Sequence, residues 1–221
     1  MPQHQGLSDL IATMATLRSP GGCPWDLEQT HESLVPYLLE EVFELIEALE
    51  SGTRADVKEE LGDVLYQVLF HADIAGADPI DPFDIDEIAQ LVDQKMRTRH
   101  PHVFASTHAT TVAEVSAQWE EIKAAEKAQR TSVLEGIPDK LSALARAASV
   151  VKRSTAVLAP TDAPQAPTYQ SEHELGEALL ALVATARAQG LDPERALRVA
   201  TRSYEDRVIE AERAQKLPKG R

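Results

Sequence analysis

The spacing of apolar residues predicts helices over most of the chain. From residue 34 to Gly52, and again after Thr53 and Thr111, apolar side chains recur every three or four positions. Asp84 and Glu87 form a pair typical of a helix start, and alternation of the kind seen in strands is scarce. We therefore expect an all-α protein of six or seven helices. These helices begin near residues 34, 53, 84, 111, 140, 171 and 193.

A proline-rich segment divides the chain. Residues 159–170 contain three prolines and no glycine, a composition typical of an extended linker. This segment separates a predicted domain over residues 1–158 from a shorter helical segment over residues 171–221. The run from Glu60 to Leu65 is echoed by the run from Glu174 to Leu179, and each is followed by a Gly-x-Asp-Pro turn. We interpret the second copy as a degenerate repeat, with chance similarity between two amphipathic helices as the alternative.

The charge balance narrows the choice of partners. The 221 residues include 36 Asp and Glu against 22 Lys and Arg, a formal net charge of −14. Such a chain repels a nucleic-acid backbone, although bound divalent metals would still allow a small anionic ligand. The sequence has no apolar stretch of membrane-spanning length, no signal-peptide pattern at the N-terminus and a single cysteine, Cys23. We expect a cytoplasmic protein that binds neither nucleic acid nor membrane.

Five carboxylates stand at helical spacing in two consecutive predicted helices. Glu41 and Glu44 are three residues apart, as are Glu60 and Asp63, so each pair shares one helix face. The short turn between the helices allows the pairs to face each other at the border of the apolar stripes. Converging carboxylates need a cation, and hard oxygen ligands suit Mg²⁺, with Mn²⁺ as a substitute. Glu40 points away from Glu41, which suits a residue that orients water; a solvated charged face is the alternative reading.

Basic and aromatic residues follow on the next two predicted helices. Lys95 and Arg99 are four residues apart, and Trp119, Lys123 and Lys127 are likewise spaced by four. Cations at these positions can neutralise phosphate oxygens, and an indole ring can stack on a nucleobase or pack in a core. Each of these residues taken alone is also compatible with a purely structural role.

Several ordered motifs together resemble one known family. These motifs are Cys23-Pro24-Trp25-Asp26 with Gln29-Thr30-His31, the two carboxylate pairs, the run from Lys95 to Phe104, Trp119-Glu120-Glu121-Ile122-Lys123, and Val133-Leu134-Glu135-Gly136-Ile137-Pro138. In this order they resemble the MazG family of nucleoside triphosphate pyrophosphohydrolases, over about residues 7–155. The carboxylate motifs alone would indicate only the wider all-α NTP pyrophosphatase superfamily.

The resemblance implies a fold, a reaction and a set of site residues. The expected fold is a four-helix-bundle-type catalytic unit that forms a homodimer. The expected reaction is Mg²⁺-dependent hydrolysis of NTP and dNTP to nucleoside monophosphate and pyrophosphate, with metal-activated water attacking the α-phosphorus. The implied metal ligands are Glu41, Glu44, Glu60 and Asp63. From the chemistry of the site itself, we expect Glu41 or Glu44 to act as the base and Glu40 to align the attacking water. The implied substrate contacts are Lys95, Arg99, Trp119, Lys123, Lys127 and Trp25.

One departure from the family pattern limits these expectations. Two-repeat members carry a second E-E-x-x-E motif, and residues 140–173 contain none, so we expect one competent site per chain. Two alternatives stay open. One is a helical dimeric module that binds metal or nucleotide without turnover; the other is a pyrophosphatase of the same superfamily with narrower specificity.

Overall fold

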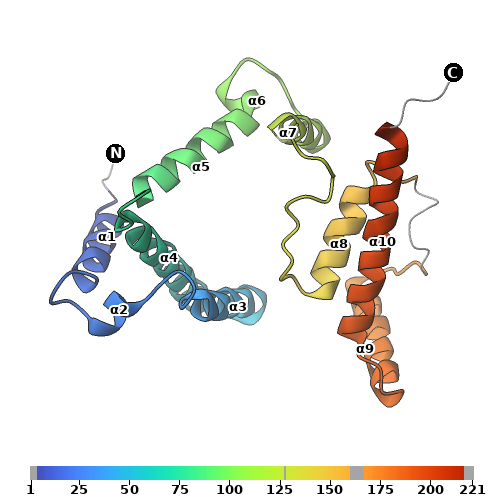
Figure 1. Cartoon of the computed structure of the whole chain (residues 1–221), viewed down its shortest axis with the longest axis horizontal. Helices are drawn as coiled ribbons and strands as arrows, with labels where there is room; N and C mark the ends of the chain where they lie inside the picture. Colours follow the sequence, from blue (N-terminus) through green and yellow to red (C-terminus); the bar gives the residue numbers. More distant parts are fainter. Residues whose placement is uncertain (1–3, 127, 160–166, 217–221) are drawn as a thin grey trace. The chain divides into compact units, whose positions relative to one another are not determined.

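The chain is built from helices joined by turns and loops. The computed structural model describes residues 4–126, 128–159 and 167–216, and no strand occurs within those ranges. They contain ten helices, none of them long and apolar enough to span a membrane. In order (Figure 1) these are α1 (Gln5–Leu17), α2 (Pro24–Glu28), α3 (Val35–Ser51), α4 (Arg54–Gly76), α5 (Ile85–Arg99), α6 (Pro101–Phe104), α7 (Val112–Glu126), α8 (Ala143–Ser154), α9 (Glu172–Ala188) and α10 (Pro193–Lys216). The prediction of an all-α fold is confirmed.

Two of the helix starts expected from sequence coincide with capping boxes in the structure. At the start of α4 and of α5, a capping box links Thr53 with Asp56 and Asp84 with Glu87. The three helices missed from sequence lack such signals. No side chain caps α1, and α2 and α6 are single turns of five and four residues that begin with proline. Elements this short show no periodicity.

The chain forms two compact units, which divide between Lys123 and Ala124. The sequence prediction placed the first boundary at residue 158 instead. The difference arises because Val150 of α8 shares a buried core with Tyr204 and Val208 of α10, so α8 belongs with the C-terminal helices. Residues 160–166 of the predicted linker lie outside the described part of the chain.

In the first unit, α3 and α4 pack along each other and α1 packs against α4. The turn between α3 and α4 needs Gly52, because a Cβ there would lie 2.8 Å from the Cα and the carbonyl oxygen of Ala48. The buried core consists of Met14, Leu34, Leu69 and Phe70, and Ile85 at the start of α5 packs against it. This packing fixes α3 beside α4 and also anchors the base of α5.

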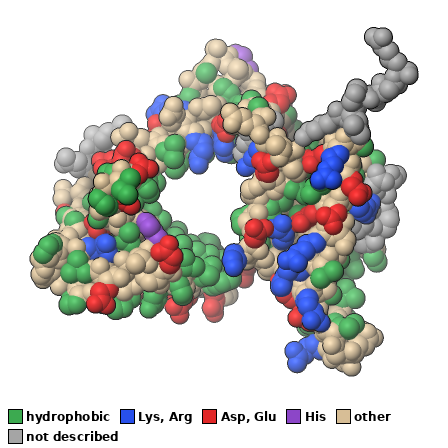
Figure 2. All heavy atoms as spheres, viewed as in Figure 1, with side chains coloured by type: hydrophobic (Ala, Val, Ile, Leu, Met, Phe, Trp, Pro, Cys, Tyr) green, Lys and Arg blue, Asp and Glu red, His purple; other side chains and the backbone are tan. Residues whose placement is uncertain are grey.

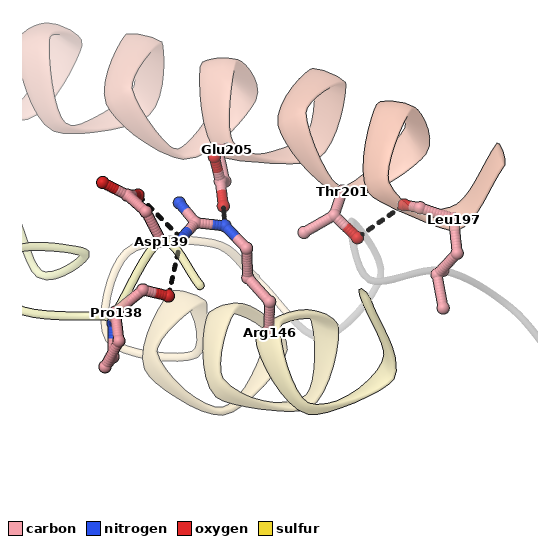
Figure 3. Close-up of polar contacts among 6 residues, drawn as sticks. All are labelled: Pro138, Asp139, Arg146, Leu197, Thr201 and Glu205. Carbon is pink, nitrogen blue, oxygen red and sulfur yellow. Dashed lines mark hydrogen bonds and ion pairs between the residues drawn. The ribbon is translucent and has the colours of Figure 1, made fainter. Parts of the chain in front are cut away.

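In the second unit, charged side chains tie a loop to two helices. Arg146 of α8 donates from Nε to Glu205 of α10 at 2.8 Å and from Nη1 to the Pro138 carbonyl and the Asp139 carboxylate (Figure 3). On α10 itself, the Thr201 hydroxyl donates to the Leu197 carbonyl in the same view. Ile137, in the Val133–Pro138 motif, lies in the buried core of this unit. The structure therefore gives this motif a packing role.

The two halves of the predicted repeat end differently. After α9, Gly190 adopts a left-handed backbone with φ of +71°, and Leu191 N–H donates to the Ala186 carbonyl at 2.8 Å. The corresponding Gly76 is the last residue of α4 and does not have a positive φ. Glu174 accepts a hydrogen bond from Gln170 N–H just before α9, so its carboxylate serves the helix start. That the C-terminal segment derives from a duplicated unit stays a prediction.

Candidate active site

Three carboxylates converge between α3 and α4. One oxygen from each of Glu41, Glu60 and Asp63 lies within 4.8 Å of the other two. Glu41 and Glu60 are half-buried and Asp63 is exposed. Glu44, one turn further along α3, shares a hydrogen bond with Glu41 and interacts electrostatically with Glu41 and Glu60. We refer to Glu41, Glu60 and Asp63 as the carboxylate cluster, with Glu44 beside it.

The electrostatics of the carboxylate cluster favour a bound cation. Burial raises the pKa of Glu41, and the charges of Asp63 and Glu44 raise it further. Burial and the charges of Glu44 and Asp63 likewise raise the pKa of Glu60. In addition, Glu60 Oε2 is buried and has no hydrogen-bond partner among the described residues. Mutually repelling carboxylates with an unpaired buried oxygen fit a hard divalent cation.

Gln67 is a member of this site that sequence reasoning did not assign. It lies one turn after Asp63 on α4, is buried, and donates a hydrogen bond that lowers the pKa of Glu41. Its own Oε1 atom is buried without a partner in the described structure. The signal available in the sequence was a polar residue at a buried position between apolar residues of α4.

Cations and an aromatic ring gather elsewhere in the first unit. The Arg99 guanidinium carbon lies 5.3 Å from the ring centroid of Trp119, and His100 meets the same ring edge-on at 5.0 Å. Lys123 forms a 3.0 Å ion pair with Glu120, and Lys95 is exposed on α5. In Figure 2, basic side chains appear where α5 leads into α6 and α7. We refer to Lys95, Arg99, Trp119 and Lys123 as the cationic–aromatic group.

The remaining predicted site residues have different surroundings. Trp25 on α2 is half exposed and meets Tyr37 edge-on at 5.6 Å and Phe70 at 6.5 Å. Glu40 is exposed and does not belong to the carboxylate cluster. Lys127 lies outside the described residues.

The structure thus assembles two groups and keeps them apart. The carboxylate cluster lies midway along α3 and α4, whereas Lys95 and Arg99 lie in the last turns of α5, which runs away from α4 (Figure 1). Glu41 of α3 lies close to Glu60 and Asp63 of α4, as the helical spacing and the short turn predict. Within the part of the chain that the structure describes, the carboxylate cluster and the cationic–aromatic group therefore form two separate groups.

Comparison with known proteins identifies the family. Residues 29–104 match the model of the MazG nucleotide pyrophosphohydrolase domain. The nucleoside triphosphate pyrophosphohydrolase of Escherichia coli K12 is 39% identical over 228 residues, covering 92% of this chain and 86% of the relative. The chain belongs to the MazG family. A Thermotoga maritima protein, named nucleoside triphosphate pyrophosphohydrolase/pyrophosphatase MazG, is 38% identical over 224 residues, with 92% and 84% covered. An uncharacterized 26.1 kDa protein of Streptomyces cacaoi is 43% identical over 206 residues, with 93% and 82% covered.

The MazG domain match covers one group of site residues completely and the other only in part. It includes all of the carboxylate cluster, with Lys95 and Arg99, and it ends before Trp119 and Lys123. The similarity to the relatives covers 92% of the chain and therefore includes most of both units. The role of each residue stays a prediction.

The raised pKa of Glu41 predicts that removing its charge stabilises the protein when no metal is bound. A folded-state pKa above the ordinary value means that the folded chain binds the proton more tightly, so stability falls as pH rises through that range. Glu41→Gln removes this repulsion and should raise the melting temperature of the metal-free protein at pH 7. The melting temperature of the wild type should instead rise by on the order of 5 °C when the Mg²⁺ concentration reaches about 100 times its Kd. Differential scanning calorimetry with EDTA or Mg²⁺ measures both effects.

The matched control for this comparison is Glu50→Gln, an exposed glutamate on the same helix. It should leave both melting temperatures unchanged. A Glu41→Gln variant that melts lower than wild type without metal, or that gains as much as wild type from Mg²⁺, would contradict the account.

Proposed function

We propose that this MazG protein hydrolyses nucleoside triphosphates, ribo and deoxy, to the nucleoside monophosphate and pyrophosphate in the presence of Mg²⁺. The observation that carries the proposal is the convergence of Glu41, Glu60 and Asp63 within 4.8 Å in a half-buried setting. The Escherichia coli and Thermotoga maritima relatives are named nucleoside triphosphate pyrophosphohydrolases, which supports the same reaction.

The carboxylates would bind the metal and accept the proton of the attacking water. Glu41, Glu60 and Asp63 would bind Mg²⁺, with Glu44 as a fourth ligand. When bound, Mg²⁺ neutralises triphosphate oxygens and lowers the pKa of a coordinated water, and Mn²⁺ can take its place. Gln67 donates a hydrogen bond to Glu41 and so favours the ionised form of its carboxylate. A metal ligand must be in that form. One of the α3 glutamates, Glu40, Glu41 or Glu44, accepts the proton of the attacking water.

The reaction is an in-line displacement at phosphorus. The water oxygen bonds to the α-phosphorus while the bond from that phosphorus to the α,β-bridging oxygen breaks, so pyrophosphate leaves. Lys95, Arg99 and Lys123 suit the charge that develops on the leaving group, with Lys127 as a further candidate. Trp119 and the half-exposed Trp25 offer aromatic surfaces to the nucleoside.

Product analysis tests this proposal. Wild type incubated with each NTP and dNTP in H₂¹⁸O should release monophosphate and pyrophosphate only when Mg²⁺ is present, with the label in the monophosphate. The double variant Glu41→Gln/Glu44→Gln should lose turnover by at least about 10²–10³-fold while its circular dichroism spectrum stays helical. Ion-exchange chromatography and mass spectrometry measure the products.

Each other outcome of the product analysis has a definite meaning. Diphosphate plus phosphate, or label in the pyrophosphate, would place the attack on a different phosphorus. Retained turnover in the double variant would remove these glutamates from the mechanism. No turnover of any nucleotide would favour a binding module, and turnover of one nucleotide alone would favour an enzyme of narrow specificity.

We also propose that the chain is a homodimer that covers an apolar face of α3 and α4. Leu39, Phe43 and Leu49 on α3 and Leu61 on α4 are each more than half exposed. Figure 2 shows apolar side chains over this part of the first unit. Monomeric proteins rarely leave so large an apolar face in water, and two such helix pairs can bury it against each other in a bundle.

A charge placed on this face should separate the subunits. Phe43→Lys should convert a dimer to a monomer, measured by size-exclusion chromatography with light scattering at micromolar concentration. The control, Leu180→Lys, changes an equally exposed leucine on α9 and should leave the mass unchanged. A monomeric wild type, or a Phe43→Lys variant with the mass of the wild-type dimer, would refute the proposed interface.

A further inference from the structure

Two histidines, His31 and His71, meet edge to edge about two turns of α4 beyond Asp63. Nδ1 of His31, in the segment before α3, lies 2.7 Å from Nδ1 of His71. The ring planes differ by 7° and the ring centroids are 5.0 Å apart. That separation is close to the Nδ1–Nδ1 distance plus the radii of both rings, so the contact lies in the plane of the two rings. It is an N–H···N hydrogen bond, in which one Nδ1 donates and the other accepts.

This histidine pair has the surroundings of a shared proton, not of a metal site. Zinc and similar ions in proteins take at least three ligating side chains. Among the described residues, no third His, Cys, Asp or Glu side chain joins the pair closely enough to share an ion with it. The pair is therefore governed by how many protons its two rings carry.

Two exposed carboxylates interact with the histidine pair, and both do so through His31. Hydrogen bonds from backbone N–H groups of the following turn lower the pKa of Asp78, and the charge of His31 lowers it further. Hydrogen bonds to its own backbone and to Thr30 lower the pKa of Glu32, and the charge of His31 adds to this effect. The negative charges that act on the pair therefore lie beside His31.

Burial decides which of the two rings donates. Nε2 of His71 is buried and has no hydrogen-bond partner among the described residues, whereas His31 is exposed. A buried N–H without an acceptor is rarer in proteins than a buried acceptor without a donor. The neutral pair therefore has one proton on Nδ1 of His71, which donates to His31, and its other proton on Nε2 of the exposed ring.

A third proton is incompatible with this arrangement. The bond between the two Nδ1 atoms uses one proton, so keeping it places the third proton on the buried Nε2 of His71. Protonation of His31 at Nδ1 breaks the bond instead, because two N–H groups then face each other. Burial lowers the pKa of His71, and the charge of His31 lowers it further. Acid therefore breaks the contact by charging the exposed ring.

The contact joins residues 29–34 to α4. Within this segment, Gln29 donates from Nε2 to the Trp25 carbonyl at 2.9 Å and accepts from the Ser33 hydroxyl at 2.7 Å. These bonds connect the turn that carries His31 with the short helix α2. A displacement of the turn is therefore passed to the half-exposed ring of Trp25.

We propose that the histidine pair is a pH-sensitive contact, which holds residues 29–34 against α4 when neutral and releases them when His31 is protonated. Release allows Trp25 to move, which weakens nucleotide binding in mild acid. This second step rests on the proposed function, because it uses the place of Trp25 beside the nucleoside. The first step does not depend on the reaction.

NMR of the imidazole nitrogens tests the first step. In ¹⁵N-labelled wild type, with both rings assigned through bonds, long-range ¹H–¹⁵N spectra at neutral pH should show a protonated Nδ1 on His71 and a protonated Nε2 on His31. Both patterns should change together on acidification. His71→Phe should leave His31 titrating near the ordinary value of about 6.5. The control, His173→Asn on the exposed face of α9, should leave the spectra of the pair unchanged.

The pH dependence of KM tests the second step. One pH unit below the midpoint of the transition, about one-tenth of the molecules keep the contact, so the KM of wild type should rise about tenfold. His31→Asn keeps an acceptor oxygen for His71 but does not titrate, so its KM should rise far less. Acid also protonates Glu41 and Glu60, but equally in both proteins. The ratio of the two KM values therefore isolates the histidine pair.

The outcomes separate this inference from the proposed function. Coupled titration of the two rings in a protein without turnover would support the pH-sensitive contact and refute the proposed hydrolysis. An active wild type whose KM follows the same pH dependence as that of His31→Asn would overturn the effect on nucleotide binding. Rings that titrate independently, or a His71 ring with its proton on Nε2 at neutral pH, would overturn the contact itself.

Discussion

The repulsion among Glu41, Glu60 and Asp63 is the constraint on which the site depends. Carboxylates held this close at a half-buried border repel one another, and burial raises the cost of ionising both Glu41 and Glu60. A fold gains nothing in stability from such an arrangement without a cation. This repulsion supports the proposal that the cluster holds a divalent cation, which would offset it.

The surrounding helices hold the carboxylates against that repulsion. The tight turn at Gly52 keeps α3 beside α4, and the core of Met14, Leu34, Leu69 and Phe70 anchors α4 against α1. Gln67 adds a direct hydrogen bond to Glu41 from a buried position. The same architecture leaves an apolar face exposed on α3 and α4, and this face underlies the proposed dimer.

Sequence reasoning succeeded where local rules decide the outcome. The starts of α4 and α5 follow from capping boxes, and the meeting of Glu41 with Glu60 and Asp63 follows from i, i+3 spacing and a short turn. Long-range packing leaves no such local signal in the sequence. The direction of α5 depends on the conformation of the 77–84 turn and on where Ile85 packs, neither of which leaves a periodic signal. The unit boundary at Lys123 likewise reflects packing of α8 on α10, which no single segment reveals.

Direct binding of Mn²⁺ is the most direct test of the claim that the carboxylate cluster is a metal site. Electron paramagnetic resonance follows free Mn²⁺ during titration of the full chain, and Mg²⁺ is then added as a competitor. The account predicts saturable binding that Mg²⁺ displaces and that Glu60→Gln/Asp63→Asn abolishes. Binding that survives in this variant, or no binding by a folded wild type in the presence or absence of nucleoside triphosphate, would contradict it.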